Sequence, residues 1–483
     1  MSSDRIFPRE KRVVEVILIL MILALGCFLS YYHHLSYEFP LHVDEWFHIA
    51  MAKQIAKLDF RDPYYGKPLR RCLEIGWHSL LALFVLLTDD VRHFTYLPSF
   101  FHALDILATF FFVDRFLGRK EAFFAALLAA IIPSHLAFGG PIFLVPINLS
   151  LIFLPISLML AFDLVKLERN QNLFLQFLIL TFLLYAHPPS AVALLAILGI
   201  YVLLLLFDRK MKKAISLILV ISLSIFCSLP NYADLIASRG IAAIKFTFFY
   251  ILEPLPFLYG LVQSIFFVIG FLSLVIKLRK ERNLEILTIL IAVILFIFNI
   301  LCFENLRVNI LLMYQRTFLP LFFLMNVISA YGFKSVLDLK FGKALALVSC
   351  LVMLYLSISH HLALTRTHLY HLITEKDYEN FLWIKHNTPH DIIAILNPWK
   401  AKAFPAIAER RVYSVMPFGP NEEALRKVKL TEEFFNMGCK NTKFLKENNI
   451  SLVYTLGKCH NEDLIEVKRG IYILKGSKLW QLL

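Results

Sequence analysis

Eleven apolar segments constrain the fold of this chain more than any other feature of its sequence. A helix needs about 20 mostly apolar residues to cross the hydrocarbon core of a bilayer. The segments are Val13–Tyr32, Phe94–Val113, Ala122–Phe138, Ile142–Val165, Leu173–Ala186, Ala191–Phe207, Ala214–Leu229, Leu255–Ile276, Leu284–Phe303, Leu312–Phe333 and Ala344–His361. The sequence therefore predicts a polytopic α-helical membrane protein with about eleven transmembrane helices.

The composition agrees with this class. Of the 483 residues, 58% are hydrophobic and 18% are charged, whereas soluble domains have roughly 45–50% apolar and about 25% charged residues. With a mean hydropathy of +0.66, these values exclude a soluble enzyme, a disordered chain and a fibrous protein. The net charge of +13 does not indicate nucleic-acid binding, because basic residues at membrane edges produce the same excess.

The basic residues predict the orientation in the membrane. If the N-terminus is cytoplasmic, 20 basic residues fall in short inner segments, and the short outer connections contain only Arg239, Lys245 and Arg307. This bias is the one that the positive-inside rule requires. It is lost if the 13-residue apolar segment Gly76–Thr88 also spans, so we predict an interfacial or re-entrant helix there. We expect a multi-pass protein of the cell membrane, with the first span as an uncleaved signal anchor.

Two larger pieces then lie outside the membrane, namely a first outer loop at about residues 33–93 and a tail. We predict a transmembrane domain over residues 1–361, which includes this loop, and a small extracytoplasmic α/β domain over residues 362–483. Thr374 and Asp377 form a capping-box signature before a helix of the tail. Short strands are expected at Ile392–Leu396, Val412–Val415, Ser451–Thr455 and Ile471–Leu474.

The cysteines divide by location. Cys72, Cys439 and Cys459 fall on the outer, oxidising side. Because Cys439 and Cys459 close a short loop within the tail, we predict a disulfide between them. The remaining cysteines lie in predicted spans, where a small buried side chain is expected.

The segment His42–His48, just after the first span, contains two adjacent carboxylates, Asp44 and Glu45. They open an amphipathic helix, and Asp44 lies where the helix dipole favours an anion. An ionised carboxylate at the membrane surface can act as a general base or as a metal ligand. The alternative is that Asp44 is an N-cap and Glu45 a solvated acid of the first turn.

An Asp-Glu pair in the first outer loop resembles the C-type (GT-C) glycosyltransferases. This superfamily includes protein O-mannosyltransferases, aminoarabinose transferases and oligosaccharyltransferase catalytic subunits, which use polyprenyl-phosphate-linked sugars on the outer face of the membrane. Further similar stretches are Tyr65–Leu69 with Trp77, the His-Pro turn in Tyr185–Ser190, and Trp383-Ile384, Asn387-Thr388 and Glu409–Arg411 in the tail.

The chain also departs from these families. Gly66 stands where the aminoarabinose-transferase branch has an acid, and the second outer loop, residues 139–148, lacks an acidic residue. The acidic outer-loop motif and the Trp-Trp-Asp motif of oligosaccharyltransferases are absent from the sequence. These departures argue against the oligosaccharyltransferase branch and against a strongly bound metal.

The resemblance implies an arginine in a late span that binds the lipid phosphate. Arg316, with Tyr314 beside it, matches this role, since a guanidinium can hold a phosphate with two hydrogen bonds. The alternatives are a snorkelling arginine and a structural ion pair, with Glu304 as a candidate partner.

Three further polar residues are candidates because ionisable groups within spans are costly. Asp105 follows His102 by three residues on one helix face and could pair with it or line the substrate cavity. A buried structural hydrogen bond is the alternative. His187 is a candidate for the acceptor site.

Two pairs with a spacing of four residues suggest a metal site. His48 follows Asp44, and His78 follows Glu74, by about one helical turn. Imidazole and carboxylate groups from such pairs could hold one divalent ion. The alternative is that these are ordinary surface histidines.

The sequence therefore predicts an inverting-type glycosyltransferase. It would move a sugar from a polyprenyl- or dolichyl-phosphate donor to a lipid, glycan or protein acceptor outside the cell. Asp44 would be the base, Glu45 would orient the acceptor, and Arg316 would bind the phosphate. The alternatives are a lipid-linked glycan flippase or other transporter, a ligase that joins whole glycan chains, and a non-catalytic subunit with the same fold.

Overall fold

The computed structural model describes residues 9–69, 73–167, 171–239, 251, 253–364, 369–417, 419 and 421–481. The chain forms two compact units. Unit 1 comprises Met1–Ser36, Leu73–Trp77 and Tyr96–His368, and unit 2 comprises Tyr37–Cys72, His78–Thr95 and Leu369–Leu483. The sequence assigns the first outer loop to the transmembrane domain, whereas in the structure most of this loop packs with the tail. Cys72 and Lys245 lie outside the described residues.

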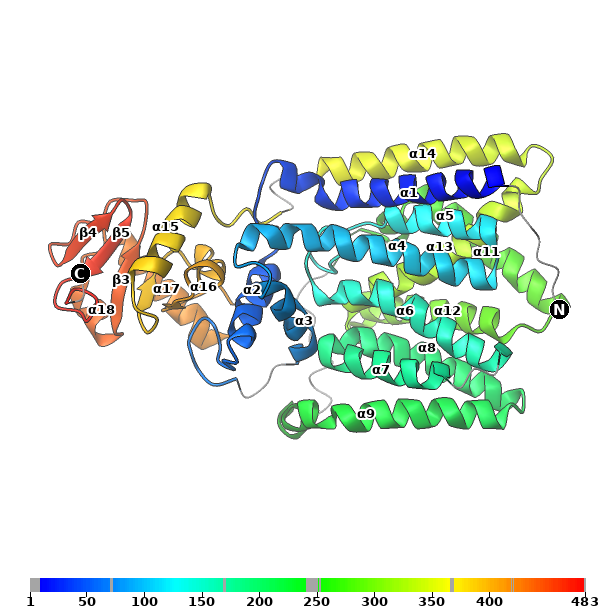
Figure 1. Ribbon diagram of the computed structural model, residues 1–483, viewed down its shortest axis with the longest axis horizontal. Coiled ribbons are helices and arrows are strands. Elements are labelled where there is room, and N and C mark those ends of the chain that lie inside the picture. The colour runs from blue at the N-terminus through cyan, green and yellow to red at the C-terminus, as the bar shows by residue number, and fades with distance from the viewer. Residues whose placement is uncertain are drawn as a thin grey trace. The chain divides into compact units, whose positions relative to one another are not determined.

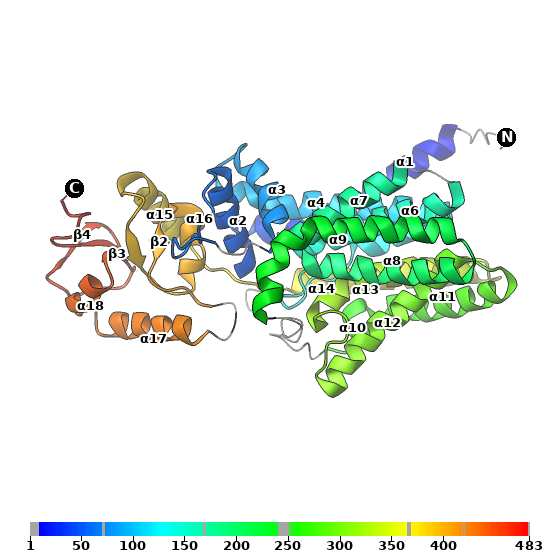
Figure 2. The ribbon, with the colours of Figure 1, turned by 90° about the horizontal axis from the view of Figure 1, so that it is seen from below.

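Unit 1 is a bundle of helices that Figure 1 shows running roughly parallel to one another. Its helices are α1 (Arg9–Tyr31), α4 (Leu97–Phe116), α5 (Arg119–Ala130), α6 (Leu149–Leu167), α7 (Gln171–Ala186), α8 (Pro188–Phe207), α9 (Met211–Arg239), α10 (Leu255–Tyr259), α11 (Leu261–Lys280), α12 (Leu284–Leu306), α13 (Tyr314–Leu337) and α14 (Gly342–Ala363), with the 3₁₀ turns η1 (Tyr32–Leu35) and η3 (Pro146–Asn148). Figure 2 shows the same bundle from below.

The described residues contain nine helices that are long and apolar enough to cross a membrane. They confirm a polytopic membrane protein, and their positions match nine of the eleven predicted spans. The helices at the other two, α5 and α7, have 12 and 16 residues. The apolar helix α3 (Ile75–Val85) has only 11 residues, which is too short to span, as expected.

The predicted third span is helical only in its first part. Residues 131–145 form an irregular, mostly buried loop between α5 and η3. Pro133, Gly139 and Gly140 interrupt the apolar run, and proline and glycine disfavour a continuous helix. The side-chain amide of Asn148 donates to the carbonyls of Gly140 (2.9 Å) and Phe143 (2.7 Å). Non-helical backbone at membrane depth is tolerated where protein groups satisfy its hydrogen bonds, as they do here.

Close contact between α11 and α13 depends on two glycines. A Cβ atom at Gly270 would lie 2.0 Å from the carbonyl oxygen of Ile328, and one at Gly332 would lie 2.0 Å from that of Phe266. Small residues at such crossings allow helix backbones to approach closely within a membrane. The two helices are therefore closely packed at this crossing.

Unit 2 is built around a five-stranded mixed sheet with the strand order β2-β1-β3-β5-β4. The strands are β1 (Ile393–Ile395), β2 (Arg411–Val412), β3 (Ile450–Tyr454), β4 (Leu464–Lys468) and β5 (Ile471–Leu474). Strand β1 is parallel to β2 and β3, whereas β5 is antiparallel to β3 and β4. The sequence predicts four of these strands but not β4, in which charged residues alternate with apolar ones.

The helices of unit 2 are α2 (Val43–Ala56), α15 (Glu375–Asn387), α16 (Phe404–Ala408), α17 (Glu422–Asn436) and α18 (Thr442–Glu447), with the 3₁₀ turns η2 (Val91–Tyr96) and η5 (Lys400–Lys402). The predicted capping box is confirmed, because Thr374 and Asp377 hydrogen-bond reciprocally at the start of α15. The predicted disulfide between Cys439 and Cys459 is also present.

Candidate functional site

Helix α2 places Asp44 in its first turn. The N-cap is His42, whose Nδ1 accepts a hydrogen bond from the Asp44 backbone N–H at 3.1 Å. The alternative that Asp44 is itself the cap is therefore wrong. The Asp44 side chain is 30% exposed and lies at the positive end of the helix dipole. Asp44 is thus an accessible carboxylate fixed at the start of a helix.

Four side chains interact electrostatically with this carboxylate, and with Asp44 they form what we call the Asp44 cluster. The His42 Nδ1 lies 3.6 Å from Asp44 Oδ2. Burial raises the pKa of Tyr64 and of Tyr370, and the negative charge of Asp44 adds to both effects. Burial lowers the pKa of Lys402 to about 7, and the charge of Asp44 opposes that shift. Both tyrosines therefore stay neutral at physiological pH.

Glu45 has a different environment from its neighbour. It is buried, with 2% exposure, and its Oε2 accepts the backbone N–H of Leu41 at 3.1 Å. It is therefore not the solvated acid of the alternative interpretation. This hydrogen bond holds the turn that leads into α2, which is a structural role.

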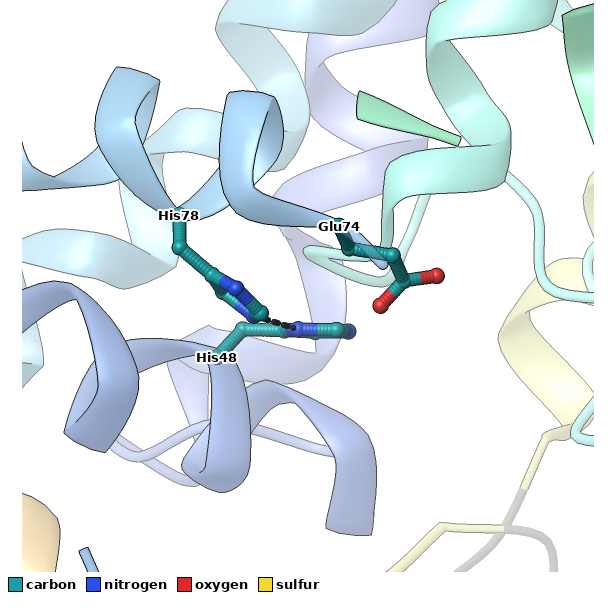
Figure 3. Close-up of side chains that lie close together, drawn as sticks. All are labelled: His48, Glu74 and His78. Atoms are coloured by element: carbon teal, nitrogen blue, oxygen red, sulfur yellow. Dashed lines mark hydrogen bonds between the residues drawn. The ribbon is translucent and has the colours of Figure 1, made fainter. Parts of the chain in front are cut away.

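His48, Glu74 and His78 lie together, as Figure 3 shows. His48 Nδ1 and His78 Nε2 are 2.9 Å apart and share a hydrogen bond. One ligand atom of each of the three residues lies within 4.8 Å of the others. Glu74 directly precedes α3 and His78 is in its first turn, so the spacing of four residues puts both on one face. Asp44 is not a member of this group.

The donor set of this triad suits a divalent ion such as zinc, which binds imidazole nitrogen and carboxylate oxygen. Burial lowers the pKa of His78 to about 3. Its imidazole is therefore neutral at physiological pH, which is the form that binds a metal. The chemistry of the residues fits the ion.

Arg316 lies in the first turn of α13 and is half-buried. No ion pair joins it to Glu304 or to another carboxylate among the residues that the structure describes. Its charge acts on the imidazole of His187. The guanidinium is therefore not consumed by a structural ion pair of the kind that the sequence left open.

Tyr314 does not share this arrangement. Its ring is fully buried and stacks on Phe303. Its hydroxyl donates to the carbonyl of Ile251 and to Glu304 Oε1, at 3.3 Å each. We therefore assign Tyr314 to packing rather than to phosphate binding.

The polar candidates within the bundle have structural partners. His187 caps α8, and its Nδ1 accepts the Ser190 N–H at 3.2 Å. Both ring nitrogens of His102 contact backbone carbonyls, those of Gly26 (3.1 Å) and Ala129 (3.0 Å).

Asp105 is buried on α4, and its Oδ1 accepts the Thr109 hydroxyl at 3.4 Å. Because His102 is occupied by the backbone, the predicted pairing of His102 with Asp105 is wrong. The structural alternative is the better interpretation for His102, whereas the second carboxyl oxygen of Asp105, Oδ2, is buried with no hydrogen-bond partner among the described residues.

The sequence reasoning missed Lys402, Tyr64 and Tyr370. Lys402 lies in the stretch Trp399–Phe404, which contains other basic and aromatic residues. Nothing in this local sequence predicts that Lys402 is buried. The signal for Tyr64 was its position before the Lys-Pro segment. No sequence pattern marked Tyr370, because only the fold brings this residue of the tail close to the segment before α2.

No family model and no curated protein sequence matches this chain, but solved structures share its fold. The oligosaccharyltransferase of Archaeoglobus fulgidus, in complex with zinc and sulfate, has a TM-score of 0.58 at 14% identity and covers 89% of this chain and 67% of its own. The same enzyme, named AglB, in complex with an inhibitory peptide and a dolichol-phosphate, has a TM-score of 0.58 at 14% identity, with 92% and 70% covered.

ArnT from Cupriavidus metallidurans, bound to undecaprenyl phosphate, also has a TM-score of 0.58, at 11% identity, and covers 96% of this chain and 98% of its own. The equal scores do not favour either branch. The chain therefore has the membrane fold of the solved structures of these GT-C proteins.

Proposed function

We propose that this chain is a membrane glycosyltransferase that transfers a sugar from a polyprenyl- or dolichyl-phosphate donor to a hydroxyl group of an acceptor outside the cell. The observation that carries the proposal is Asp44, an accessible carboxylate at the start of α2, within a fold that it shares with proteins solved with dolichol-phosphate and undecaprenyl phosphate.

Asp44 has the properties of a general base. Its carboxylate is 30% exposed, so an acceptor hydroxyl can reach it. It would take the proton of that hydroxyl while the oxygen attacks the anomeric carbon from the face opposite the phosphate. The new glycosidic bond forms as the bond between the anomeric carbon and the phosphate oxygen breaks, which inverts the configuration. General bases of this kind contribute roughly 10²–10⁴-fold to the rate.

Arg316 supports the departure of the phosphate. Charge on the leaving phosphate grows as the glycosidic bond breaks, and a guanidinium stabilises this charge through two parallel hydrogen bonds. His187, whose imidazole feels the same positive charge, would border the site. We include neither Tyr314 nor His102 in it.

The triad of His48, Glu74 and His78 would hold a divalent cation. A bound cation would supply positive charge near the start of α2 and α3, and would fix the two histidines in one orientation. We propose that the ion supports the folding of this region.

The orientation and the domain boundaries are part of the proposal. The positive-inside bias supports a cytoplasmic N-terminus and an extracytoplasmic unit 2. Residues 1–361 would form the membrane domain and residues 362–483 the tail, with the first outer loop packed on the tail.

The test is sugar transfer by purified protein in proteoliposomes that contain polyprenyl-phosphate sugars and a panel of lipid, glycan and peptide acceptors. Product formation and release of polyprenyl phosphate should follow each other one to one. We expect Arg316→Met to lower kcat/KM by about 10²–10³-fold, as for the loss of a donor to a developing anion. Arg316→Lys should recover part of the loss, because it keeps the charge but not the paired hydrogen bonds.

Arg279→Met is the matched control, since Arg279 is an exposed arginine at the end of α11. Full activity of Arg316→Met would contradict the assignment of this residue. Absence of transfer by the unmodified protein, with every donor and acceptor tried, would favour a non-catalytic or transport function.

A further inference from the structure

Trp399 presents an aromatic surface that the proposed reaction does not yet use. It directly precedes the 3₁₀ turn η5 and is 41% exposed. By contrast, Trp46 and Trp77 are fully buried. A large apolar ring left open to solvent is informative when it belongs to a defined surface, so the contacts of Trp399 decide what it can do.

The indole of Trp399 stacks on the ring of Tyr370. The ring centroids are 5.9 Å apart and the planes differ by 18°. Tyr370 in turn meets the imidazole of His42 edge-on, with the centroids 5.9 Å apart at 83°. The backbone N–H of Tyr370 donates to the carbonyl of Leu41 at 2.9 Å. The rings of Trp399, Tyr370 and His42 therefore form one continuous surface, which we call the Trp399 platform.

The Trp399 platform ends at the proposed base. His42 Nδ1 lies 3.6 Å from Asp44 Oδ2, and all these residues belong to unit 2. The exposed indole forms the other end, two ring contacts away. Because Trp399 and Asp44 are both partly exposed, one short ligand can contact both of them.

Polar contacts on both sides of Trp399 hold its backbone in place. Asn397 Oδ1 accepts the backbone N–H groups of Trp399 at 2.9 Å and of Lys400 at 3.3 Å. Lys400 Nζ forms an ion pair with the buried Asp377 at 2.7 Å. A ring that is fixed before binding loses little conformational freedom when a ligand stacks on it.

Asn397 also places a polar group beside the ring. It is exposed, and its side-chain Nδ2 has no hydrogen-bond partner among the described residues. A side-chain amide of this kind can donate to a hydroxyl oxygen. The region thus combines an aromatic surface with a few placed polar groups, which is typical of a small-molecule site.

This combination suits a saccharide. One face of a pyranose ring consists largely of C–H groups, which are attracted to the negative face of an aromatic ring. Its hydroxyl groups remain free to bond with an amide such as that of Asn397. A saccharide also supplies the hydroxyl that Asp44 would deprotonate, whereas an acyl chain supplies none. A serine or threonine peptide has the hydroxyl but lacks the flat C–H face.

We propose that the Trp399 platform binds a sugar ring of the acceptor, so that the acceptor is a glycan. The inference rests on the proposed function. The acceptor would stack on Trp399 and present one hydroxyl at Asp44. That hydroxyl oxygen bonds to the anomeric carbon of the donor sugar, its proton passes to Asp44, and the bond from the anomeric carbon to the lipid phosphate breaks.

The first test compares acceptors in the proteoliposome assay, with mannobiose, cellobiose, chitobiose, a serine- and threonine-containing peptide and a lipid alcohol offered separately. We expect transfer to at least one disaccharide and little to the others. Trp399→Ala should raise KM for that disaccharide roughly 5–10-fold, the loss of one aromatic contact, with kcat within about twofold. Trp399→Phe should recover most of the affinity, because it keeps an aromatic face.

Trp399→Leu separates stacking from folding, since leucine keeps an apolar contact with Tyr370 but offers no aromatic face. Its KM should resemble that of Trp399→Ala. Trp480→Ala is the matched control, because Trp480 is 42% exposed and makes no ring contact in the described part of the chain. Its KM should be unchanged. An unchanged KM in Trp399→Ala, or equal transfer to the peptide and the disaccharide, would overturn the inference.

A second measurement does not need turnover. Saturation-transfer NMR with the same disaccharides and purified protein in nanodiscs reports which sugar protons lie against the protein. The unmodified protein and Trp480→Ala should saturate the C–H protons of one pyranose face, and Trp399→Ala and Trp399→Leu should lose most of this signal. Equal signals in all four proteins would contradict the inference. That result is expected if Trp399 instead anchors the protein at the membrane interface, where tryptophan is enriched.

The two measurements separate the two claims. Disaccharide binding that depends on Trp399, without sugar transfer by the unmodified protein, would reject the proposed function and retain the saccharide site. Sugar transfer with the same KM in Trp399→Ala, and NMR signals that do not depend on Trp399, would reject the saccharide site and retain the proposed function.

Discussion

Helices α2 and α4 each carry an aspartate and a histidine about one turn apart, and the two pairs have opposite environments. On α2, Asp44 is 30% exposed and is surrounded by titratable side chains, while His48 contacts His78. On α4, both ring nitrogens of His102 contact backbone carbonyls. Asp105 accepts the hydroxyl of Thr109 through Oδ1, and its Oδ2 is buried with no hydrogen-bond partner among the described residues.

The difference shows that residue type and spacing do not identify a functional pair. Side-chain atoms that the backbone already satisfies stabilise the bundle, because an unsatisfied polar group in a membrane costs several kcal/mol. A carboxylate that is partly exposed and lies near other ionisable side chains, as Asp44 does, remains available to bind or deprotonate a substrate. The comparison therefore favours chemistry for Asp44 of α2 and packing for His102 of α4.

Removing a metal ligand from the triad should have a large effect on zinc binding. Loss of an outer-shell partner lowers metal affinity by about 10–100-fold, so His48→Ala should weaken zinc binding by at least that amount, and His78→Ala likewise. His102→Ala should leave zinc affinity unchanged, because His102 is held by the backbone. Competition with a chromophoric chelator measures these affinities.

Equal zinc binding by His48→Ala and the unmodified protein would contradict the proposal that the triad binds the ion. The titration is done after the purification tag has been cleaved, since a histidine tag binds the same ion.

Replacing His102 should have a smaller effect, namely a loss of thermal stability in His102→Ala. Losing the buried hydrogen bond from the imidazole N–H to a backbone carbonyl, together with part of a side chain, should cost about 2 kcal/mol, which lowers Tm by several degrees. The folded fraction of His102→Ala should transfer sugar at the normal rate. Thermal unfolding followed by a thiol-reactive dye measures the shift, with the exposed His386→Ala as the control.

A Tm equal to that of the unmodified protein, combined with lost transfer, would mean that His102 takes part in the chemistry. The assignment of His102 on α4 to packing would then be wrong.

Much of the fold could be predicted from the sequence because it depends on local patterns. Nine of the eleven spans predicted from apolar length match long apolar helices of the described residues. The Thr374–Asp377 spacing predicts the start of α15, and the short loop between Cys439 and Cys459 predicts the disulfide. Hydropathy fails where proline and glycine interrupt an apolar run. The predicted span Ala122–Phe138 is therefore helical only as far as Ala130.

The site was less predictable, because its electrostatics come from distant segments. Asp44 could be found from its place after the first span. The burial of Lys402 depends on how the outer loop packs on the tail. No local pattern carries that information.

The central claim is that Asp44 is the base and that Asp105 is a packing residue. The most direct test compares sugar transfer by Asp44→Asn and Asp105→Asn, each replacing a carboxylate by an amide of the same shape, at equal amounts of folded protein. The account predicts a fall of about 10²–10⁴-fold for Asp44→Asn, the loss expected for a general base, and a rate close to normal for Asp105→Asn. Normal transfer by Asp44→Asn, or a comparable loss in Asp105→Asn, would contradict it.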